Sequence, residues 1–305
     1  MSRPTDGSDG KLMGAFVAAA RLKYADETPA QRAARLRQLL DDKIHGLCFS
    51  AYVEGQHPDD HVVLSDGQVR ERLGVIAPHC RWIRTFACTE GNELAASLGK
   101  EMGLKTLVGA WVGDDPARNE EELEGVIRLA RGGHVDRIAV GNEVLLRGEA
   151  SVEQIVELMR RTREAVPGVP VGYVDAYFQF IQHPALVEAC DFLPINCYPF
   201  WEKCPIDQAV PYAAEMVRRV QAVAQGKPVI IAETGWPSEG PAEGAAEPSL
   251  DNMILYALNL VEWSADNDVE LFWFSAFDEA WKVGAEGGAG AYWGLWTSDG
   301  RLKVA

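Results

Sequence analysis

The chain has 305 residues, of which 47% are hydrophobic and 24% are charged. This composition is typical of a folded globular protein and excludes a disordered chain. The 29 basic and 45 acidic residues give a formal net charge of −16. Because such a surface repels phosphate backbones and anionic lipids, we expect neither nucleic acid nor a membrane as a partner. A neutral ligand is not disfavoured by this charge.

The first part of the chain carries no clear targeting signal. Leu12–Ala20 is apolar, but it is shorter than the roughly 18 residues of a membrane helix. Arg21 and Lys23 follow it without a convincing signal-peptide cleavage site. We expect residues 1–27 to be a flexible leader and residues 28–305 to form one folded domain. The bare sequence favours the cytoplasm and leaves the periplasm or secretion open.

The cysteines are spread along the chain without a CxxC pair, and several lie within apolar runs. In a chain of this length we predict buried free thiols rather than a disulfide framework. These residues are Cys48, Cys80, Cys88, Cys190, Cys197 and Cys204.

Short apolar runs alternate with longer amphipathic stretches along the chain. Most runs are continuous and rich in Val, Ile or aromatic residues, which is typical of strands buried on both faces. Eight such strands with crossover helices predict a single (β/α)8 TIM barrel, and the alternative is an open doubly wound sheet. The predicted strands are Gly46–Tyr52, Trp82–Cys88, Thr106–Gly113, Arg137–Val144, Pro170–Ala176, Phe192–Pro199, Pro228–Thr234 and Val269–Phe277.

Local signals mark several of the intervening helices. Ser151–Val166 opens with a serine followed by Gln154, which is the pattern of a capping box. Asn119 precedes three glutamates and is expected to cap another helix. The glycine-rich segment Gly284–Ala291 is expected to be a flexible loop. Further helices are predicted at Asp207–Gln225 and Ser249–Asn267.

Two of the predicted strands end in a glutamate. The fourth run ends with VGNE at Glu143, and the seventh ends with IIAE at Glu233. Functional residues of a (β/α)8 barrel lie at these C-terminal strand ends, where apolar surroundings raise a carboxyl pKa into the range of acid–base chemistry. Two carboxyl groups that face each other across a pocket are what glycosidic cleavage requires. Either glutamate alone is equally explained as a helix cap.

The same two segments carry a family resemblance. VGNEVL (Val140–Leu145) and IAETGWPS (Ile231–Ser238) resemble the active-site signatures of glycoside hydrolase family 17, the β-1,3-glucanases and β-1,3-glucanosyltransferases. The resemblance runs from about residue 46 to the C-terminus, and its first strand is more similar to bacterial than to plant members. It implies a (β/α)8 barrel and a retaining double displacement. Further matching segments are FSAYVEGQ (Phe49–Gln56), IRTF (Ile83–Phe86), NCYPFW (Asn196–Trp201), FDEAWK (Phe277–Lys282) and YWGLWTSDG (Tyr292–Gly300).

The resemblance implies roles for individual residues. Glu143 matches the general acid/base, and Glu233 matches the nucleophile. Asn142 matches the residue that binds the 2-hydroxyl of the sugar being cleaved, and Tyr198 matches a tyrosine that hydrogen-bonds the nucleophile. An acidic and basic pair after the eighth strand is expected to bind sugar hydroxyls and balance charge. This pair is Glu279 and Lys282.

The remaining candidates for substrate binding each have a structural alternative. Arg84 ends the second strand and either steadies Glu233 or forms a structural salt bridge. Tyr52 either contacts sugar or packs in the core, Asp175 either binds a hydroxyl or caps a helix, and Asn196 ends the sixth strand. Of the tryptophans in the late loops, we expect only one or two to stack on sugar rings. They are Trp201, Trp236, Trp281, Trp293 and Trp296.

Other chemistries are poorly supported. His57 and His61 are close in sequence, but Pro58 predicts a loop and no third metal ligand is implied. The chain has no nucleophile elbow, no P-loop and no dinucleotide-binding glycine pattern. We therefore expect neither a metal nor a cofactor.

The sequence thus predicts a retaining glycoside hydrolase or transglycosylase whose partner is a β-glucan oligosaccharide or polysaccharide. The acceptor, endo or exo action and the oligomeric state stay open. One alternative is a non-catalytic β-glucan-binding barrel. Another is a Schiff-base aldolase, although no lysine ends the sixth strand.

Overall fold

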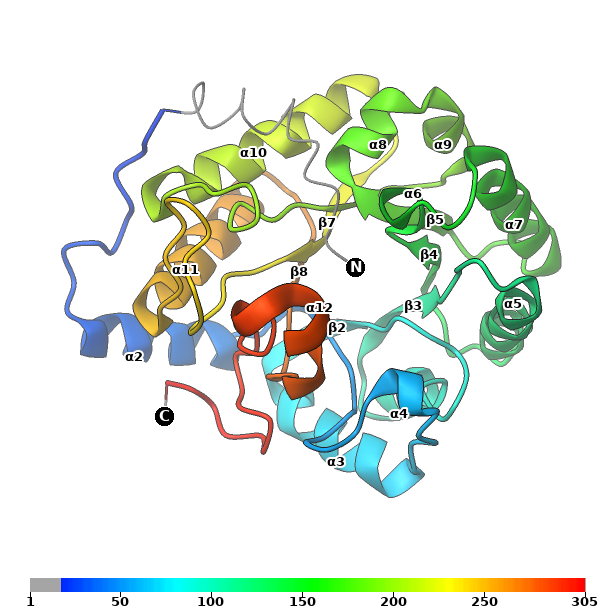
Figure 1. Ribbon diagram of the computed structural model, residues 1–305, viewed down its shortest axis with the longest axis horizontal. Helices are drawn as coiled ribbons and strands as arrows, with labels where there is room; N and C mark the ends of the chain where they lie inside the picture. Colours follow the sequence, from blue (N-terminus) through cyan, green and yellow to red (C-terminus); the bar gives the residue numbers. More distant parts are fainter. Residues whose placement is uncertain (1–17, 305) are drawn as a thin grey trace.

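The computed structural model describes residues 18–304 and shows a closed barrel of eight parallel strands (Figure 1). The strands follow chain order around the barrel, and β8 pairs with β1 to close it. The predicted (β/α)8 barrel is therefore confirmed, and the open doubly wound sheet is wrong. The strands are β1 Ile44–Cys48, β2 Cys80–Arg84, β3 Lys105–Ala110, β4 Arg137–Asn142, β5 Val171–Ala176, β6 Leu193–Asn196, β7 Val229–Thr234 and β8 Leu271–Trp273.

Helices surround the barrel and cover the outer faces of its strands (Figure 1). Helix α2 precedes the first strand, α12 follows the last, and the others lie in the connections. The α-helices are α2 Pro29–Asp41, α3 Asp66–Ile76, α4 Leu94–Glu101, α5 Pro116–Arg131, α6 Val144–Arg147, α7 Val152–Ala165, α8 Tyr177–Gln182, α9 Pro184–Ala189, α10 Ile206–Val223, α11 Leu250–Asp266 and α12 Val283–Glu286. Short 3-10 turns are η1 Pro58–Asp60, η2 Ala77–His79, η3 Ala280–Lys282 and η4 Gly287–Ala289.

All eight predicted strands are present, but most end earlier than their apolar runs. The second ends at Arg84 and the eighth at Trp273. Residues beyond these strand ends are still buried: Cys88 and Phe277, for example, are each only 1% exposed. The loops at this end of the barrel therefore pack their apolar side chains without extending the sheet, and a hydrophobic pattern does not distinguish the two situations.

The helix signals gave mixed results. Helix α7 begins with the predicted capping box of Ser151 and Gln154. The prediction that Asn119 caps a helix is wrong: α5 begins earlier, with Asp115 as its N-cap. The Asn119 side chain instead bonds both the N–H and the C=O of Gly113, at 2.8 and 2.9 Å. The glycine-rich segment Gly284–Ala291, expected to be a loop, contains the short turns of α12 and η4.

Part of the predicted leader lies against the barrel. The Ala20 N–H donates to the carbonyl of Asp207 at 3.0 Å, and the Tyr24 hydroxyl donates to Glu262 at 3.0 Å. These contacts attach the segment to α10 and α11. Residues 1–17 of that prediction lie outside the described residues.

The six cysteines are all buried and free, as predicted. Burial raises the pKa of the Cys48 thiol to about 12, so this thiol stays protonated. Within residues 18–304, no helix is long and apolar enough to cross a membrane.

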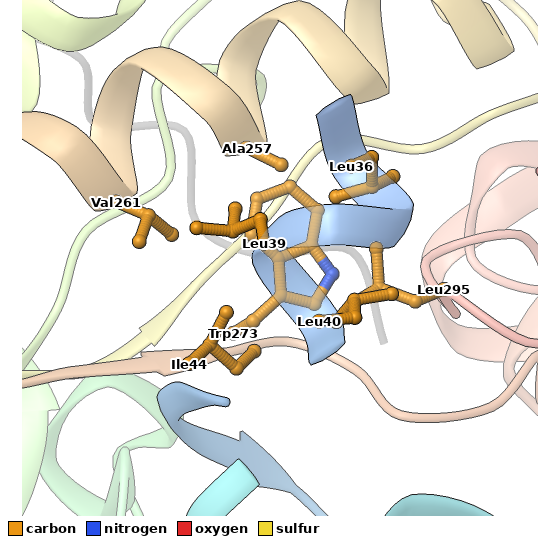
Figure 2. Close-up of a pocket in the computed structure, with 8 residues that line it drawn as sticks. All are labelled: Leu36, Leu39, Leu40, Ile44, Ala257, Val261, Trp273 and Leu295. Carbon is orange, nitrogen blue, oxygen red and sulfur yellow. The ribbon is translucent and has the colours of Figure 1, made fainter. Parts of the chain in front are cut away.

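Helix α2 packs against the outside of the barrel at β1 and β8. Figure 2 shows a small apolar pocket here, in which Trp273 of β8 meets α2 from one side and α11 from the other. Leu36 and Leu40 of α2 are 2% and 0% exposed, so this contact contributes to the core. The lining residues are Leu36, Leu39, Leu40, Ile44, Ala257, Val261, Trp273 and Leu295.

We predict that Leu36→Ala lowers the free energy of unfolding by about 2–5 kcal/mol, because it enlarges this apolar pocket. Urea unfolding followed by circular dichroism measures the change. Leu39→Ala is the matched control: Leu39 lines the same pocket but is only partly buried, so its loss is expected to be smaller. Equal losses for the two variants would contradict the role given to Leu36.

Candidate active site

The backbone turns sharply where β4 delivers Glu143 to the barrel mouth. Gly141 has φ +87° and Glu143 has φ +53°, and the register between β4 and β5 shifts between Ala139 and Asn142. A Cβ on Gly141 would lie 2.9 Å from a methyl of Val144, so this turn requires glycine. A left-handed conformation at a non-glycine residue costs about 1–2 kcal/mol. Neighbouring bonds must therefore hold Glu143 in place.

Those bonds come from β5 and α6. The Glu143 N–H donates to the carbonyl of Val174 at 2.8 Å. The Leu145 N–H, in the first turn of α6, donates to the Tyr173 hydroxyl at 2.9 Å and to Asp175 at 3.2 Å. The Arg147 guanidinium donates to the carbonyl just before Glu143. The acid at the end of β4 is thus fixed from two sides.

Asp175 is 0% exposed, so the prediction that it contacts substrate is wrong. It does not cap the following helix either, because the N-cap of α8 is Ala176. The Asp175 carboxyl group also accepts a hydrogen bond from the Tyr173 hydroxyl and one from the Ala176 N–H. Burial, with the nearby charge of Glu143, raises the pKa of Asp175 from 3.8 to about 7. Asp175 therefore supports the Glu143 turn from behind.

Glu233 lies at the end of β7, where the strand is irregular on both sides. The register shifts against β6 between Ile195 and Asn196, and against β8 between Ile231 and Thr234. Such bulges re-aim side chains next to active sites. Here they direct a carboxylate into the barrel mouth, where it is only 5% exposed.

Both oxygens of Glu233 are held. Arg84 Nη1 lies 2.6 Å from Oε1, and the Tyr198 hydroxyl donates to Oε2 at 2.6 Å. Burial lowers the pKa of Arg84, but the charge of Glu233 acts together with Cys48 and the hydrogen bonds to both groups, and the net effect raises that pKa. Burial and the same charge raise the pKa of Tyr198 well above its ordinary value. Both partners therefore remain donors and stabilise the negative charge of Glu233.

Two asparagines connect the glutamates. Asn142 Oδ1 accepts a hydrogen bond from Arg84 Nη2 at 2.7 Å. Asn196 Nδ2 donates to Glu143 Oε1 at 3.0 Å and lies 3.5 Å from Asn142 Oδ1. A single chain of contacts thus runs from Glu143 through Asn196, Asn142 and Arg84 to Glu233. The structure brings these predicted residues together in one site.

The predicted Glu279 and Lys282 pair lies on the same side as Tyr198. Lys282 Nζ is 2.9 Å from Glu279 Oε2 and 3.9 Å from the centre of the Phe274 ring, which packs edge-on against Tyr198. Burial lowers the pKa of Lys282, but Glu279, Glu286 and Glu233 together raise it. The site therefore holds a second buried cation.

Several buried polar atoms near this site have no hydrogen-bond partner within the described chain. Buried polar groups are normally paired, so such atoms indicate where a ligand's hydroxyl groups can bind. They are Arg84 Nε, Asn196 Oδ1, Glu279 Oε1, Trp281 Nε1 and Trp293 Nε1.

The tryptophans separate into different environments. Trp236 is 0% exposed, and its N–H donates to the carbonyl of Glu247 at 2.9 Å. The prediction that Trp236 contacts substrate is wrong, because both its ring faces are covered. Trp201 is half-buried and tilted against Trp293, with 5.5 Å between ring centres. Its sugar contact stays a prediction.

Tyr52 and the two histidines line the first loop. Tyr52 is 7% exposed and its hydroxyl accepts from Asn92 at 3.1 Å, so its sugar contact also stays a prediction. His57 Nδ1 accepts from the Asp59 N–H at 3.0 Å as the N-cap of η1. His61 lies 2.6 Å from Glu90. Residues 18–304 contain no group of three metal-ligating side chains.

Sequence reasoning missed three residues around Glu143. Tyr173 and Arg147 hold the turn but have no recognisable motif, because both act through backbone groups of other segments. Trp111 follows β3 directly and is 40% exposed. It lay inside the predicted third strand, so an examination of every strand end for aromatic residues would have found it.

We predict that the stability advantage of the wild type over Asp175→Asn decreases as pH rises. The folded-state pKa of Asp175 is raised to about 7, so its contribution is fully present below the unfolded pKa and is lost as pH rises through about 7. Urea unfolding at about pH 5 and about pH 8 should show a decrease of more than about 1 kcal/mol. A difference that is constant with pH would contradict the raised pKa.

Comparisons with known proteins agree with this geometry. The BtgE/BtgC glycoside hydrolase domain matches residues 46–294. The glucan 1,3-beta-glucosidase of Arthroderma benhamiae is 26% identical over 268 residues, covering 78% of this chain and 85% of the relative. The glucan 1,3-beta-glucosidase of Schizosaccharomyces pombe is 28% identical over 267 residues, covering 81% of this chain and 83% of the relative.

Among solved structures, the glycoside hydrolase family 17 beta-1,3-glucanosyltransferase of Rhizomucor miehei superimposes with a TM-score of 0.77 at 27% identity. The match covers 86% of this chain and 96% of that one. These relatives are fungal, so the closer resemblance to bacterial members stays a prediction. The matched domain spans most of the barrel and both strand-terminal glutamates. The chain belongs to the BtgE/BtgC domain family of glycoside hydrolases, within glycoside hydrolase family 17.

Proposed function

We propose that this glycoside hydrolase cleaves β-1,3-glucan chains with retention, by double displacement through a covalent glycosyl-enzyme. The observation that carries the mechanism is the asymmetry of the two glutamates. Glu233 is held at both oxygens by a cation and a phenol, as a nucleophile requires, whereas Glu143 contacts the amide of Asn196. The relatives named as glucan 1,3-beta-glucosidases and beta-1,3-glucanosyltransferase support the substrate class.

A further solved structure supports the same substrate. An active-site mutant of the Rhizomucor miehei beta-1,3-glucanosyltransferase, 26% identical to this chain, is in complex with laminaritriose. One fungal relative is named a cell surface mannoprotein, and we propose action outside the cytoplasm on that basis.

In the first step Glu233 attacks the anomeric carbon while Glu143 protonates the departing oxygen. Arg84 and Tyr198 orient the attacking carboxylate and remain bonded to it as its charge is consumed in the ester. Asn142, which accepts from Arg84 through its oxygen, keeps its NH2 group for the 2-hydroxyl of the sugar.

In the second step Glu143 removes a proton from the incoming acceptor, which attacks the same carbon and releases Glu233. Water as acceptor gives hydrolysis, and a sugar hydroxyl gives transfer. The chemistry at Glu143 and Glu233 is common to both. Glu279, Lys282 and Asn196 bind sugar hydroxyls beside the reacting carbon, with Trp201 and Tyr52 as apolar contacts.

The first test is the stereochemistry of the wild-type enzyme. Proton NMR of early products from laminarin should show the β-anomer first, because two inversions restore the configuration. Initial release of the α-anomer would exclude the covalent intermediate. Products longer than a laminari-oligosaccharide substrate would identify transfer. A lack of any product from laminarin would contradict the proposed substrate and favour a glucan-binding protein.

The second test compares the two glutamates by leaving group. Glu233→Ala should lower kcat by about 10³-fold or more on laminarin and on aryl β-glycosides alike, because no nucleophile remains. Glu143→Ala should lose much less kcat/KM on aryl glycosides than on laminarin, because kcat/KM reports the first step and an aryl leaving group needs no protonation there. Circular dichroism checks that both variants fold. The assignment is wrong if Glu143→Ala loses as much kcat/KM with activated leaving groups as with laminarin.

A further inference from the structure

Trp111 is the one exposed Phe, Tyr or Trp within residues 18–304. At 40% exposure it differs from Trp236 and Trp293, which are 0% and 1% exposed. Single exposed apolar side chains are common on proteins, so exposure alone assigns no function. The function proposed for Trp111 depends instead on the position of its side chain and on the residues that contact it.

The alternation of β3 gives the direction of the side chain. Thr106 faces outward, because a Cβ on Gly99 of α4 would lie 3.8 Å from its methyl. Lys105 and Leu107 therefore face the barrel interior, and Trp111, one residue beyond the strand, continues their side of the alternation toward the mouth. Consistent with this, Lys105 Nζ lies 5.3 Å from the centre of the Trp82 ring.

The height of Trp111 follows from the same strand. Ala110, the last residue of β3, pairs with Val140 of β4, so Trp111 lies level with Gly141, two residues before Glu143. This places it at the mouth of the barrel, next to the turn of the acid.

Trp111 is held rigidly. Its backbone N–H donates to Glu122 at 3.0 Å, and Glu122 is 1% exposed and also accepts from the backbone N–H of Cys88 at 2.7 Å. The Arg147 guanidinium lies 4.6 Å from the ring centre and donates to the carbonyl of Val112 at 2.9 Å. One face of the indole is therefore covered, and its exposed area belongs to the rest of the ring.

Arg147 also connects Trp111 to the acid. The same guanidinium donates to the carbonyl of Asn142, directly before Glu143. The Trp111 ring thus lies next to the turn that presents Glu143, on the side away from Glu233. An ordered indole at the rim of a sugar-cleaving site provides an apolar face that matches the C–H face of a pyranose.

We propose that Trp111 is a stacking platform for a glucose ring outside the cleaved linkage, so that it sets the preference for long chains. This inference rests on the proposed function for its ligand. The charge of the protein does not oppose such a contact, because a neutral ring meets no repulsion from the acidic surface.

The test separates KM from kcat. Trp111→Ala should raise KM for laminarihexaose about tenfold, and leave kcat on an aryl β-laminaribioside within about twofold. Trp111→Phe should restore most of the affinity, since a phenyl face still stacks. Ile181→Ala, which removes another exposed apolar side chain, should change neither constant. If Trp111→Ala lowers kcat on the aryl substrate by as large a factor as it raises KM for laminarihexaose, then Trp111 positions Arg147 and the proposed platform is wrong.

Binding provides a direct readout in a Glu233→Gln background. Laminarihexaose should shift the tryptophan fluorescence of the parent to shorter wavelength, and Trp111→Phe should abolish most of that shift. Titration with cellohexaose tests the proposed β-1,3-glucan substrate separately from the proposed role of Trp111. A parent that binds cellohexaose but not laminarihexaose contradicts the proposed substrate, and the platform is then judged on cellohexaose. A Trp111→Ala variant that binds either sugar as the parent does contradicts the platform.

Discussion

The active site depends on one buried ion pair. Arg84 at the end of β2 and Glu233 at the end of β7 approach to 2.6 Å, with side chains only 1% and 6% exposed. Removing either partner would leave an uncompensated buried charge, which is strongly destabilising. Two further hydrogen bonds stabilise the pair, because Tyr198 donates to the second oxygen of Glu233 and Asn142 accepts from Nη2 of Arg84. Since these residues come from four different strand ends, the site forms only when the barrel closes.

The second constraint is local distortion of otherwise regular strands. A regular strand alternates its side chains, so adjacent residues such as Asn142 and Glu143 would point to opposite faces. The left-handed turn at Glu143 and the bulge before it overcome this alternation. Tyr173, Asp175 and Arg147 hold the distorted segment from β5 and α6. The strain at the acid is therefore offset by hydrogen bonds from neighbouring elements.

For aromatic residues, the sequence pattern does not predict whether the side chain packs in the core or contacts a ligand. Trp236 lies within the most specific family segment, yet it is part of the core between Phe200 and Tyr256. Trp111 lies within an ordinary apolar strand pattern, yet it is exposed at the rim. An indole suits both environments, since it combines a large apolar area with one polar group. Only the neighbours that cover its faces decide between core packing and ligand contact.

The sequence by itself determined the eight strands, the barrel and the two strand-terminal glutamates. The reason is that hydrophobic periodicity, and a charged residue at the end of an apolar run, are local patterns that can be recognised in the linear sequence. It also indicated Arg84, Asn142 and Tyr198 through segments that resemble a family. The tertiary structure alone decided that Asp175 lies sealed behind Glu143 rather than toward a ligand, and that Trp236 is covered. It also decided that the strands stop short of their apolar runs. Burial, facing and strain depend on segments far apart in the chain, and those contacts exist only after the barrel has closed.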